Sequence, residues 1–475
     1  MVFSSTIFIF GFLPLLVLVY FVARDEARNY VLLLFSLIFY AWGGPKFLLV
    51  MVAVVLIDYV MAIGIEYFKR KSYMAVSRAC LLFSIISNIG VLIFYKYTKF
   101  FLENIKLLLN CEIVIPNIIL PIGISFFTFQ ALSYVIDVYK KDADVQKNFF
   151  YLLLYVSLFP QLVAGPIVRY KTVDKEIAKR SVTQQDIVDG IERFILGFAK
   201  KVILANKLGE LADSIYNSGD NLFTLTAWLA AAAYMLQIYF DFSAYSDMAI
   251  GLGRIFGFHF MENFNFPYIS KSVTEFWRRW HISLSTWFRD YIYIPLGGNR
   301  CGKGRWFFNL FVVWLLTGIW HGASWNFILW GLYYFIFLIF EKVFLGRFLN
   351  KLPSCFQHLY TLFIIFIGWI LFRIESLQGI MQMFRTMFSF KIDEVSLNLV
   401  SLYLCKYGIY LVAAIIFSVP IHPYFKTKIS AYLSNYRTMK ISVICIYYGM
   451  LLVLFYVTVL YLINSTYNPF IYFRF

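Results

Sequence analysis

The chain has 475 residues, of which 61% are hydrophobic, 21% aromatic and only 14% charged. Soluble proteins carry about 25% charged residues, so this composition argues against a soluble globular protein and makes lipid the expected solvent. The net charge of +16 comes from 42 basic and 26 acidic residues. Such an excess is typical of cytoplasmic loops in a membrane protein, and it also attracts anionic lipids or a phosphate-bearing substrate. No nucleic-acid partner is expected.

Apolar runs recur along the whole chain, and a run of about 20 residues is long enough to cross a bilayer. They lie near residues 6–22, 29–44, 46–68, 79–97, 116–138, 149–165, 222–250, 306–322, 324–345, 357–373, 400–421 and 441–463. Proline and glycine interrupt two of them, at Pro116, Pro121 and Gly123 and again at Pro160, Gly165 and Pro166. We therefore predict an all-α polytopic membrane protein with about eleven spans, plus re-entrant and interfacial helices, as one domain over residues 1–475.

The basic residues predict an orientation for these helices. No charge precedes Phe8, whereas Arg24 and Arg28 follow the first helix and residues 69–71 form a basic run after the third. Because loops rich in Lys and Arg stay in the cytoplasm, the N-terminus is predicted to lie outside. The last helix then brings residues 464–475 to the outer face. The first segment lacks a cleavage site of small residues, so we interpret it as a retained helix.

The least apolar part of the chain is residues 167–221. Within it, residues 183–208 place apolar side chains at helical spacing with charges between them. This pattern predicts amphipathic helices at the cytoplasmic interface. A second such helix is predicted over residues 377–390.

Two of the five histidines, His281 and His321, lie among tryptophans and apolar residues, in "FWRRWHISLSTWFRDYIYIPLGGNR" and "WLLTGIWHGASW". In a soluble protein a buried histidine is usually a satisfied core residue, but ionisable groups inside a membrane usually mark a pathway or a site. Histidine can also take a proton and return it near neutral pH. His321 is thus a candidate general base on a hydroxyl, with neighbouring glycines that allow close approach and Trp320 and Trp325 to exclude water.

The segment 271–305 is rich in basic residues, with aromatic residues between them. These are Lys271, Arg278, Arg279, Arg289, Arg300, Lys303 and Arg305. The segment is either a positive cytoplasmic loop with aromatic anchors or a basic re-entrant vestibule for an anionic cytosolic substrate. "GGNRCGK" within it lacks the Ser or Thr and the preceding strand of a phosphate-binding loop, so no nucleotide site is predicted.

Asp241 and Asp247 lie in the apolar run "QIYFDFSAYSDMAIG". They could form a proton relay, or they could pair with arginines of residues 278–289 and stabilise the packing. We favour the structural role, because small and aromatic neighbours indicate tight helix packing. The six cysteines are scattered, with no CxxC pair and none close to a histidine, so neither a disulfide framework nor a metal site is predicted.

The two histidine motifs, together with "YFDFSAYSDMAIGLGRIFGF", "PQLVAGPIVRY" and "NPFIYFRF", resemble the membrane-bound O-acyltransferases, and within them the bacterial alginate and peptidoglycan O-acetyltransferases. The resemblance implies a ring of membrane helices around a central funnel, with His321 as the catalytic histidine and His281 as a secondary one. It also implies that residues of these motifs bind the donor. The residues expected to do so are Arg278, Arg279, Trp280, Asp290, Trp320, Trp325 and Asn326.

The resemblance further implies acetyl-CoA or another acyl-CoA as the donor substrate, with no tightly bound cofactor. An extracytoplasmic partner, such as an SGNH-type acyltransferase, would place the acyl group on a polysaccharide. The tail "FIYFRF" is similar to a C-terminal motif in the D-alanylation system, which implies Tyr472 as an acyl relay; the alternative is an aromatic belt at the membrane interface. The implied location is the bacterial cytoplasmic membrane, with both termini outside.

Two other functions remain open at this point. Within the family, the chain could transfer D-alanine from a carrier protein to teichoic acid. From a different class, it could be a proton-coupled transporter that uses Asp241, Asp247 and His321 as a proton pathway, although no internal repeat supports this.

Overall fold

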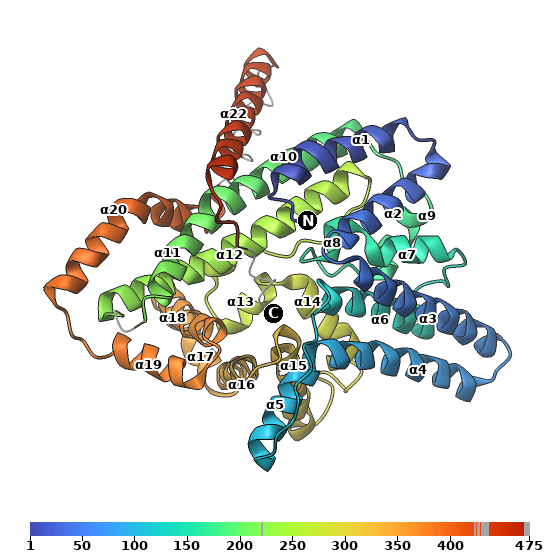
Figure 1. The fold of residues 1–475 in the computed structure, drawn as a ribbon, viewed down its shortest axis with the longest axis horizontal. Coiled ribbons are helices and arrows are strands. Elements are labelled where there is room, and N and C mark those ends of the chain that lie inside the picture. Colours follow the sequence, from blue (N-terminus) through green and yellow to red (C-terminus); the bar gives the residue numbers. More distant parts are fainter. Residues whose placement is uncertain (220–221, 422–423, 425–427, 429–436, 470–475) are drawn as a thin grey trace. The chain divides into compact units, whose positions relative to one another are not determined.

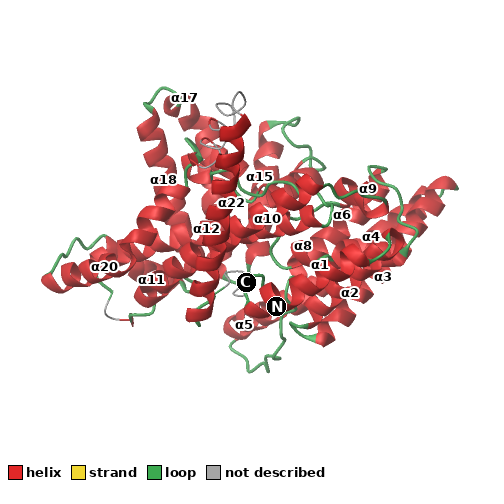
Figure 2. Cartoon of the chain, turned by 90° about the horizontal axis from the view of Figure 1, so that it is seen from above, coloured by secondary structure: helices red, strands yellow, loops and turns green. Residues whose placement is uncertain are grey.

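A computed structural model describes residues 1–219, 222–421, 424, 428 and 437–469 of the chain. These residues form helices joined by loops and contain no strand, as predicted (Figure 2). The chain divides into two compact units. The first unit comprises Met1–Ile191 and Ala249–Met261, and the second comprises Glu192–Met248 and Glu262–Phe475.

The first unit contains the N-terminal helices, whose α labels are those of Figure 1, and short helical turns, here named η. They are η1 (Phe8–Phe12), α1 (Leu13–Val22), α2 (Asp25–Ala41), α3 (Pro45–Arg70), α4 (Met74–Leu92), η2 (Ile93–Tyr97), α5 (Thr98–Leu109), α6 (Ile124–Lys140), α7 (Phe149–Ser157), α8 (Phe159–Leu162), α9 (Tyr170–Ala178) and the start of α10 (Gln184–Ala199).

Aromatic residues and one buried carboxylate organise the interior of the first unit. The rings of Phe8, Phe39 and Phe159 contact one another at 5.6–6.2 Å between centroids, which places aromatic area in the core at favourable tilted geometries. Asp58 on α3 accepts hydrogen bonds from Ser84 at 2.5 Å and Asn88 at 2.9 Å on α4. These bonds satisfy a buried acid and fix the two long helices against each other.

The second unit contains the remaining helices. They are the rest of α10, η3 (Lys200–Ala205), α11 (Asn206–Tyr216), α12 (Thr224–Ile255) as far as Met248, η5 (Pro267–Ile269), α13 (Val273–Arg279), α14 (Ile282–Phe288), η6 (Arg289–Tyr293), α15 (Lys303–His321), α16 (Trp325–Phe340), η7 (Glu341–Leu345), α17 (Gly346–Leu349), α18 (Ser354–Arg373), α19 (Leu377–Met387), α20 (Glu394–Phe417) and α22 (Arg437–Asn464).

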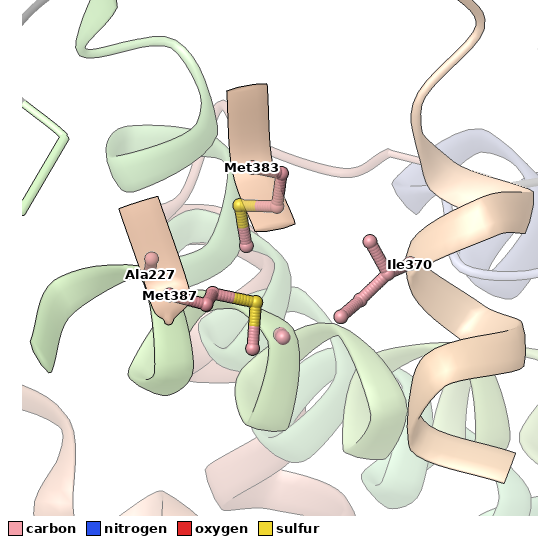
Figure 3. Close-up of a cluster of buried hydrophobic side chains, with 5 residues drawn as sticks. Ala227, Ile370, Met383 and Met387 are labelled. Atoms are coloured by element: carbon pink, nitrogen blue, oxygen red, sulfur yellow. The ribbon is translucent and has the colours of Figure 1, made fainter. Parts of the chain in front are cut away.

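The helix predicted over residues 377–390 is α19, and its apolar face is buried. Met383 and Met387 pack with Ala227 on α12 and Ile370 on α18 (Figure 3). The small alanine side chain lets the flexible methionines fill the space between the helices. The apolar face predicted over residues 377–390 thus packs inside the second unit, on α12 and α18.

Among the described residues, six helical segments are long and apolar enough to cross a membrane. They are Pro45–Arg70, Met74–Leu109, Trp325–Leu349, Ser354–Arg373, Glu394–Phe417 and Ile441–Asn464. The other runs expected to span are shorter or less apolar helices. The interruptions fall where proline and glycine predict them: α6 begins only after Gly123, and α7 and α8 are separated at Leu158.

Candidate functional site

His321 is the last residue of α15 and is buried, with 7% of its surface exposed. Aromatic rings from three helices surround its imidazole. The centroid of Trp330 on α16 lies 5.0 Å away, and that of Phe372 on α18 lies 5.2 Å away, both edge to face. Trp320 contacts the same ring at 5.0 Å. The imidazole is therefore enclosed largely by aromatic rings and has little contact with solvent.

Glycines on α15 and α16 bring these two helices close together below His321. A Cβ atom on Gly318 would lie 2.4 Å from the carbonyl oxygen of Phe327, and one on Gly331 would lie 2.4 Å from that of Trp314. A Cβ atom on Gly322 would overlap the ring of Phe327 at 2.1 Å. The glycines around His321 therefore allow the close approach of a neighbouring backbone and ring.

His281 lies between α13 and α14 and is 1% exposed. Its φ of 45° is in the left-handed region, which non-glycine residues adopt only where the surrounding structure holds them, often at functional sites. Its ring packs on Phe242 at 4.6 Å and faces the indole of Trp320 at 6.0 Å. Both buried histidines thus lie next to the indole of Trp320.

Asn263 fixes the orientation and tautomer of His281. The backbone N–H of Ser283 donates to Asn263 Oδ1 at 3.2 Å, so the atom at this position must be the amide oxygen. The amide nitrogen of Asn263 in turn donates to Ser246 at 2.9 Å. Because Oδ1 can only accept, Nδ1 of His281, 3.1 Å away, carries the proton. Nε2 is then an acceptor, and it is buried with no hydrogen-bond partner among the described residues.

His281 lies outside the six apolar spans, and burial lowers the pKa of its imidazole to about 3. The cause is the loss of hydration that the charged form would suffer. The ring is therefore neutral at physiological pH, which agrees with a single proton on Nδ1.

A cavity of about 310 Å³ opens beside His281 and is lined mainly by apolar and aromatic side chains. Three cationic residues, Arg278, Arg289 and Lys342, also line it. Thr317, one turn before His321 on α15, belongs to the lining, whereas His321 is not among the described residues that line this cavity. Apolar walls with a few polar groups are typical of a site for a small organic ligand.

The other predicted donor-binding residues have different surroundings. Arg279 pairs with Glu275 at 2.9 Å, and Asp290 pairs with Arg289 at 2.7 Å. Trp280 is buried among aromatic rings, including Trp369 at 4.7 Å. These contacts stabilise the wall of the cavity.

Trp325 and Asn326 begin α16, and only the second is buried. Trp325 is 52% exposed, so it contributes less to the exclusion of water than the sequence suggested. Asn326 is fully buried and donates to the carbonyl oxygens of Leu371 and Phe372 at 3.3 and 3.2 Å. It therefore satisfies the last carbonyls of α18, including that of Phe372, whose ring packs on His321.

Asp241 and Asp247 form ion pairs, as the favoured interpretation held, but their partners differ from those expected. Asp241 lies 2.6 Å from Lys201, and Asp247 lies 2.7 Å from Lys200 and 2.9 Å from Arg193. These cations come from α10 and η3, so the prediction of pairing with arginines of residues 278–289 is wrong. The apolar pattern of the 183–208 helix hid the cations, because they reach the acids from its polar side.

Glu341 is a site residue that the sequence did not single out. Its carboxylate accepts from the N–H groups of Val273 and Thr274, at 2.6 and 2.9 Å, and from the hydroxyl of Thr274. It thus satisfies the first turn of α13, the helix that presents Arg278 to the cavity. The only hint of this role in the sequence is that Glu341 is a single acidic residue in an otherwise apolar run. Tyr472 lies outside the described residues.

Comparison with known proteins agrees with this architecture. Residues 141–384 match the model of the membrane-bound O-acyltransferase family. The chain is 42% identical to the probable alginate O-acetylase AlgI of Pseudomonas aeruginosa over 403 residues, 83% of this chain and 76% of the relative. It is 35% identical to the peptidoglycan O-acetyltransferase of Helicobacter pylori over 437 residues, 85% of this chain and 81% of the relative.

A third relative is more distant. The teichoic acid D-alanyltransferase of Bacillus subtilis is 31% identical over 242 residues, 48% of this chain and 61% of the relative.

This helical chain has several candidate membrane spans and two buried histidines, and it matches a family of membrane-bound enzymes that transfer acyl groups. The chain belongs to the membrane-bound O-acyltransferase family and is an O-acyltransferase.

Proposed function

We propose that this O-acyltransferase moves an acetyl group from a cytosolic acyl-CoA donor across the membrane, for O-acetylation of an extracytoplasmic cell-wall or exopolysaccharide polymer. The names of the relatives that cover most of the chain, an alginate O-acetylase and a peptidoglycan O-acetyltransferase, support the acetyl group and the polymer. The observation that carries the proposal is the pair of buried imidazoles around Trp320, one of them beside an apolar cavity with a cationic wall.

The chemistry of the cavity supports coenzyme A as the donor. Coenzyme A joins a phosphate-bearing nucleotide to a long, mostly apolar arm that ends in the thioester. Arg278, Arg289 and Lys342 complement phosphate charge, and the apolar walls suit the arm. Nε2 of His281 is an acceptor for an amide N–H of that arm.

His321 acts as the general base of the transfer. Its neutral imidazole takes the proton of an acceptor hydroxyl, whose oxygen attacks the thioester carbonyl. The new carbon–oxygen bond forms as the carbon–sulfur bond breaks. The thiolate of coenzyme A leaves, and the proton stays on the imidazolium of His321. The aromatic rings of Trp320, Trp330 and Phe372 keep water from taking the acetyl group.

The first acceptor hydroxyl is that of Tyr472, on the outer side, and an extracytoplasmic SGNH-type acyltransferase moves the acetyl group from it to the polymer. The relay is supported by the resemblance of the C-terminal motif, and the partner by the resemblance to the acetyltransferase family. The membrane is the bacterial cytoplasmic membrane, with both termini outside.

The test is turnover of labelled acetyl-CoA by the full chain in lipid vesicles. His321→Ala should lower turnover by about 10²–10⁴-fold, the usual effect of removing a general base. The matched control is His259→Ala, because His259 is half-exposed in the first unit and pairs with Glu176. Full activity in His321→Ala, with unchanged gel-filtration behaviour, would refute the proposal.

The same vesicles separate the rival functions. Turnover of a D-alanyl carrier protein, with none of acetyl-CoA, would indicate D-alanyl transfer. Uptake of label without release of free coenzyme A would indicate transport.

A further inference from the structure

The segment that follows α22 is bound to α11 through side-chain hydrogen bonds. The hydroxyl of Tyr467 donates to Asp213 Oδ2 at 2.6 Å. One residue further, Asn468 Oδ1 accepts from the amide nitrogen of Asn206 at 3.3 Å. Consecutive residues of the segment thus contact positions two turns apart on one helix, so the segment lies along α11.

Lys201 on η3 binds the next residue of the segment. Its ammonium group donates to the carbonyl oxygen of Pro469, to Asn206 at 2.9 Å, and to Asp241, with which it forms an ion pair at 2.6 Å. All three N–H groups of the lysine therefore have partners. The side chains of Lys201 and Asp241 are each 2% exposed. A buried ion pair is a weak source of stability. We therefore attribute the Lys201–Asp241 pair to binding of the Pro469 carbonyl oxygen by the lysine.

The position of Tyr467 is also prepared by the surrounding residues. Gly209 leaves room for its hydroxyl, because a Cβ atom there would lie 3.2 Å from it and 2.6 Å from Gln237 Nε2. Burial and the hydrogen bond to the Asp213 carboxylate raise the pKa of Tyr467, so its hydroxyl keeps the proton that it donates. Asp213 is itself held by Arg373 at 2.5 Å.

Arg373 connects this arrangement to the histidine site. It directly follows Phe372, whose ring packs edge to face on His321 at 5.2 Å. The residue that orients Asp213 and the residue that covers His321 are therefore neighbours at the end of α18.

We propose that Lys201, Asn206 and Asp213 form a docking site for the chain's own C-terminal segment, and that they position it for acyl transfer. This role rests on the proposed function, in which Tyr472 receives the acetyl group. Tyr472 follows Pro469 by three residues in the sequence, so the docked segment is the one that leads to the proposed acceptor hydroxyl. Docking thereby raises the effective concentration of that hydroxyl.

The docking is tested without reference to activity by trimming the purified full chain with a carboxypeptidase and following the product masses. In the wild type, trimming should slow at residues 467–469. Tyr467→Phe removes one hydrogen bond to a charged group and should speed trimming past this point on the order of tenfold. The matched control is Tyr456→Phe on α22, because Tyr456 is 63% exposed.

The role in the reaction is tested by comparing two rates in the same variants. Tyr467→Phe and Tyr467→Phe/Asn468→Ala should lose acetylation of the acceptor about tenfold or more, whereas hydrolysis of acetyl-CoA to free coenzyme A should stay within about twofold of wild type. Unchanged trimming would overturn the docking site. Faster trimming with unchanged acceptor acetylation would overturn its role in transfer. If the wild type turns over no acetyl-CoA, both the proposed function and the role of the segment in transfer are refuted. The trimming experiment would still test the docking site in that case.

Discussion

The amide oxygen of Asn263 lies 3.1 Å from Nδ1 of His281 and accepts the one proton of that ring. The same oxygen accepts from the backbone N–H and the hydroxyl of Ser283, so its orientation is fixed from several directions. The consequence is that Nε2, the nitrogen left as an acceptor, belongs to a neutral ring beside the cavity.

Replacing this amide by a carboxylate should change how activity depends on pH. In the wild type the pKa of His281 is about 3, so its ring stays neutral across the working range and imposes no acid limb above that pH. In Asn263→Asp the added negative charge favours the imidazolium and raises this pKa, and a protonated Nε2 can no longer accept. We therefore expect Asn263→Asp to lose activity at low pH and to regain it as the pH rises. The midpoint of this rise should lie at a higher pH than in wild type.

The measurement is the pH profile of acetyl-CoA turnover. The control is Asn265→Asp, two residues away and exposed. Identical profiles for Asn263→Asp and wild type would show that the tautomer of His281 has no part in turnover.

Glu341 should contribute to stability by holding the start of α13. Glu341→Ala leaves the buried N–H groups of Val273 and Thr274 without an acceptor, which should cost about 2–4 kcal/mol. Glu341→Gln keeps the shape and one good acceptor, and should lose less. Thermal unfolding in detergent measures the order wild type, Glu341→Gln, Glu341→Ala. Glu375→Ala, at an exposed position, is the control, and an equal midpoint for it and Glu341→Ala would contradict the prediction.

The close approach of α15 and α16 should tolerate no side chain at Gly318. A Cβ atom there would lie 2.4 Å from a backbone oxygen, so Gly318→Ala must separate the helices and disturb the rings around His321. We expect a loss of about 1–3 kcal/mol from overpacking and a fall in turnover of at least about tenfold.

Gly304 on the same helix provides the matched control for this substitution. A Cβ atom there meets nothing within 4 Å, so Gly304→Ala should stabilise the helix by up to about 1 kcal/mol through propensity alone. Equal unfolding midpoints for the two variants would mean that the contact between α15 and α16 is looser than described.

The helical fold, the interruptions of α6 and α7 and the two buried histidines could be predicted from the sequence, because apolar periodicity and proline or glycine act locally. The partners of Asp241 and Asp247 could not, because a tertiary ion pair joins segments whose spacing in the chain carries no signal. The same limit hid Asn263 and Lys342. Each is a single polar residue whose role depends on which helix ends meet it in the fold.

The cationic wall of the cavity should affect donor binding more than the chemical step. Arg278→Gln and Lys342→Gln each remove a charge that faces the cavity, and should raise the KM for acetyl-CoA about tenfold with kcat changed less than about twofold, since the phosphates lie far from the thioester. The effect should shrink as salt rises, because added ions screen the same attraction. Arg279→Gln is the matched control, since Arg279 is paired with Glu275 and does not line the cavity. Steady-state kinetics at two ionic strengths decide the matter, and an unchanged KM in Arg278→Gln/Lys342→Gln would exclude this cavity as the phosphate-binding part of the donor site.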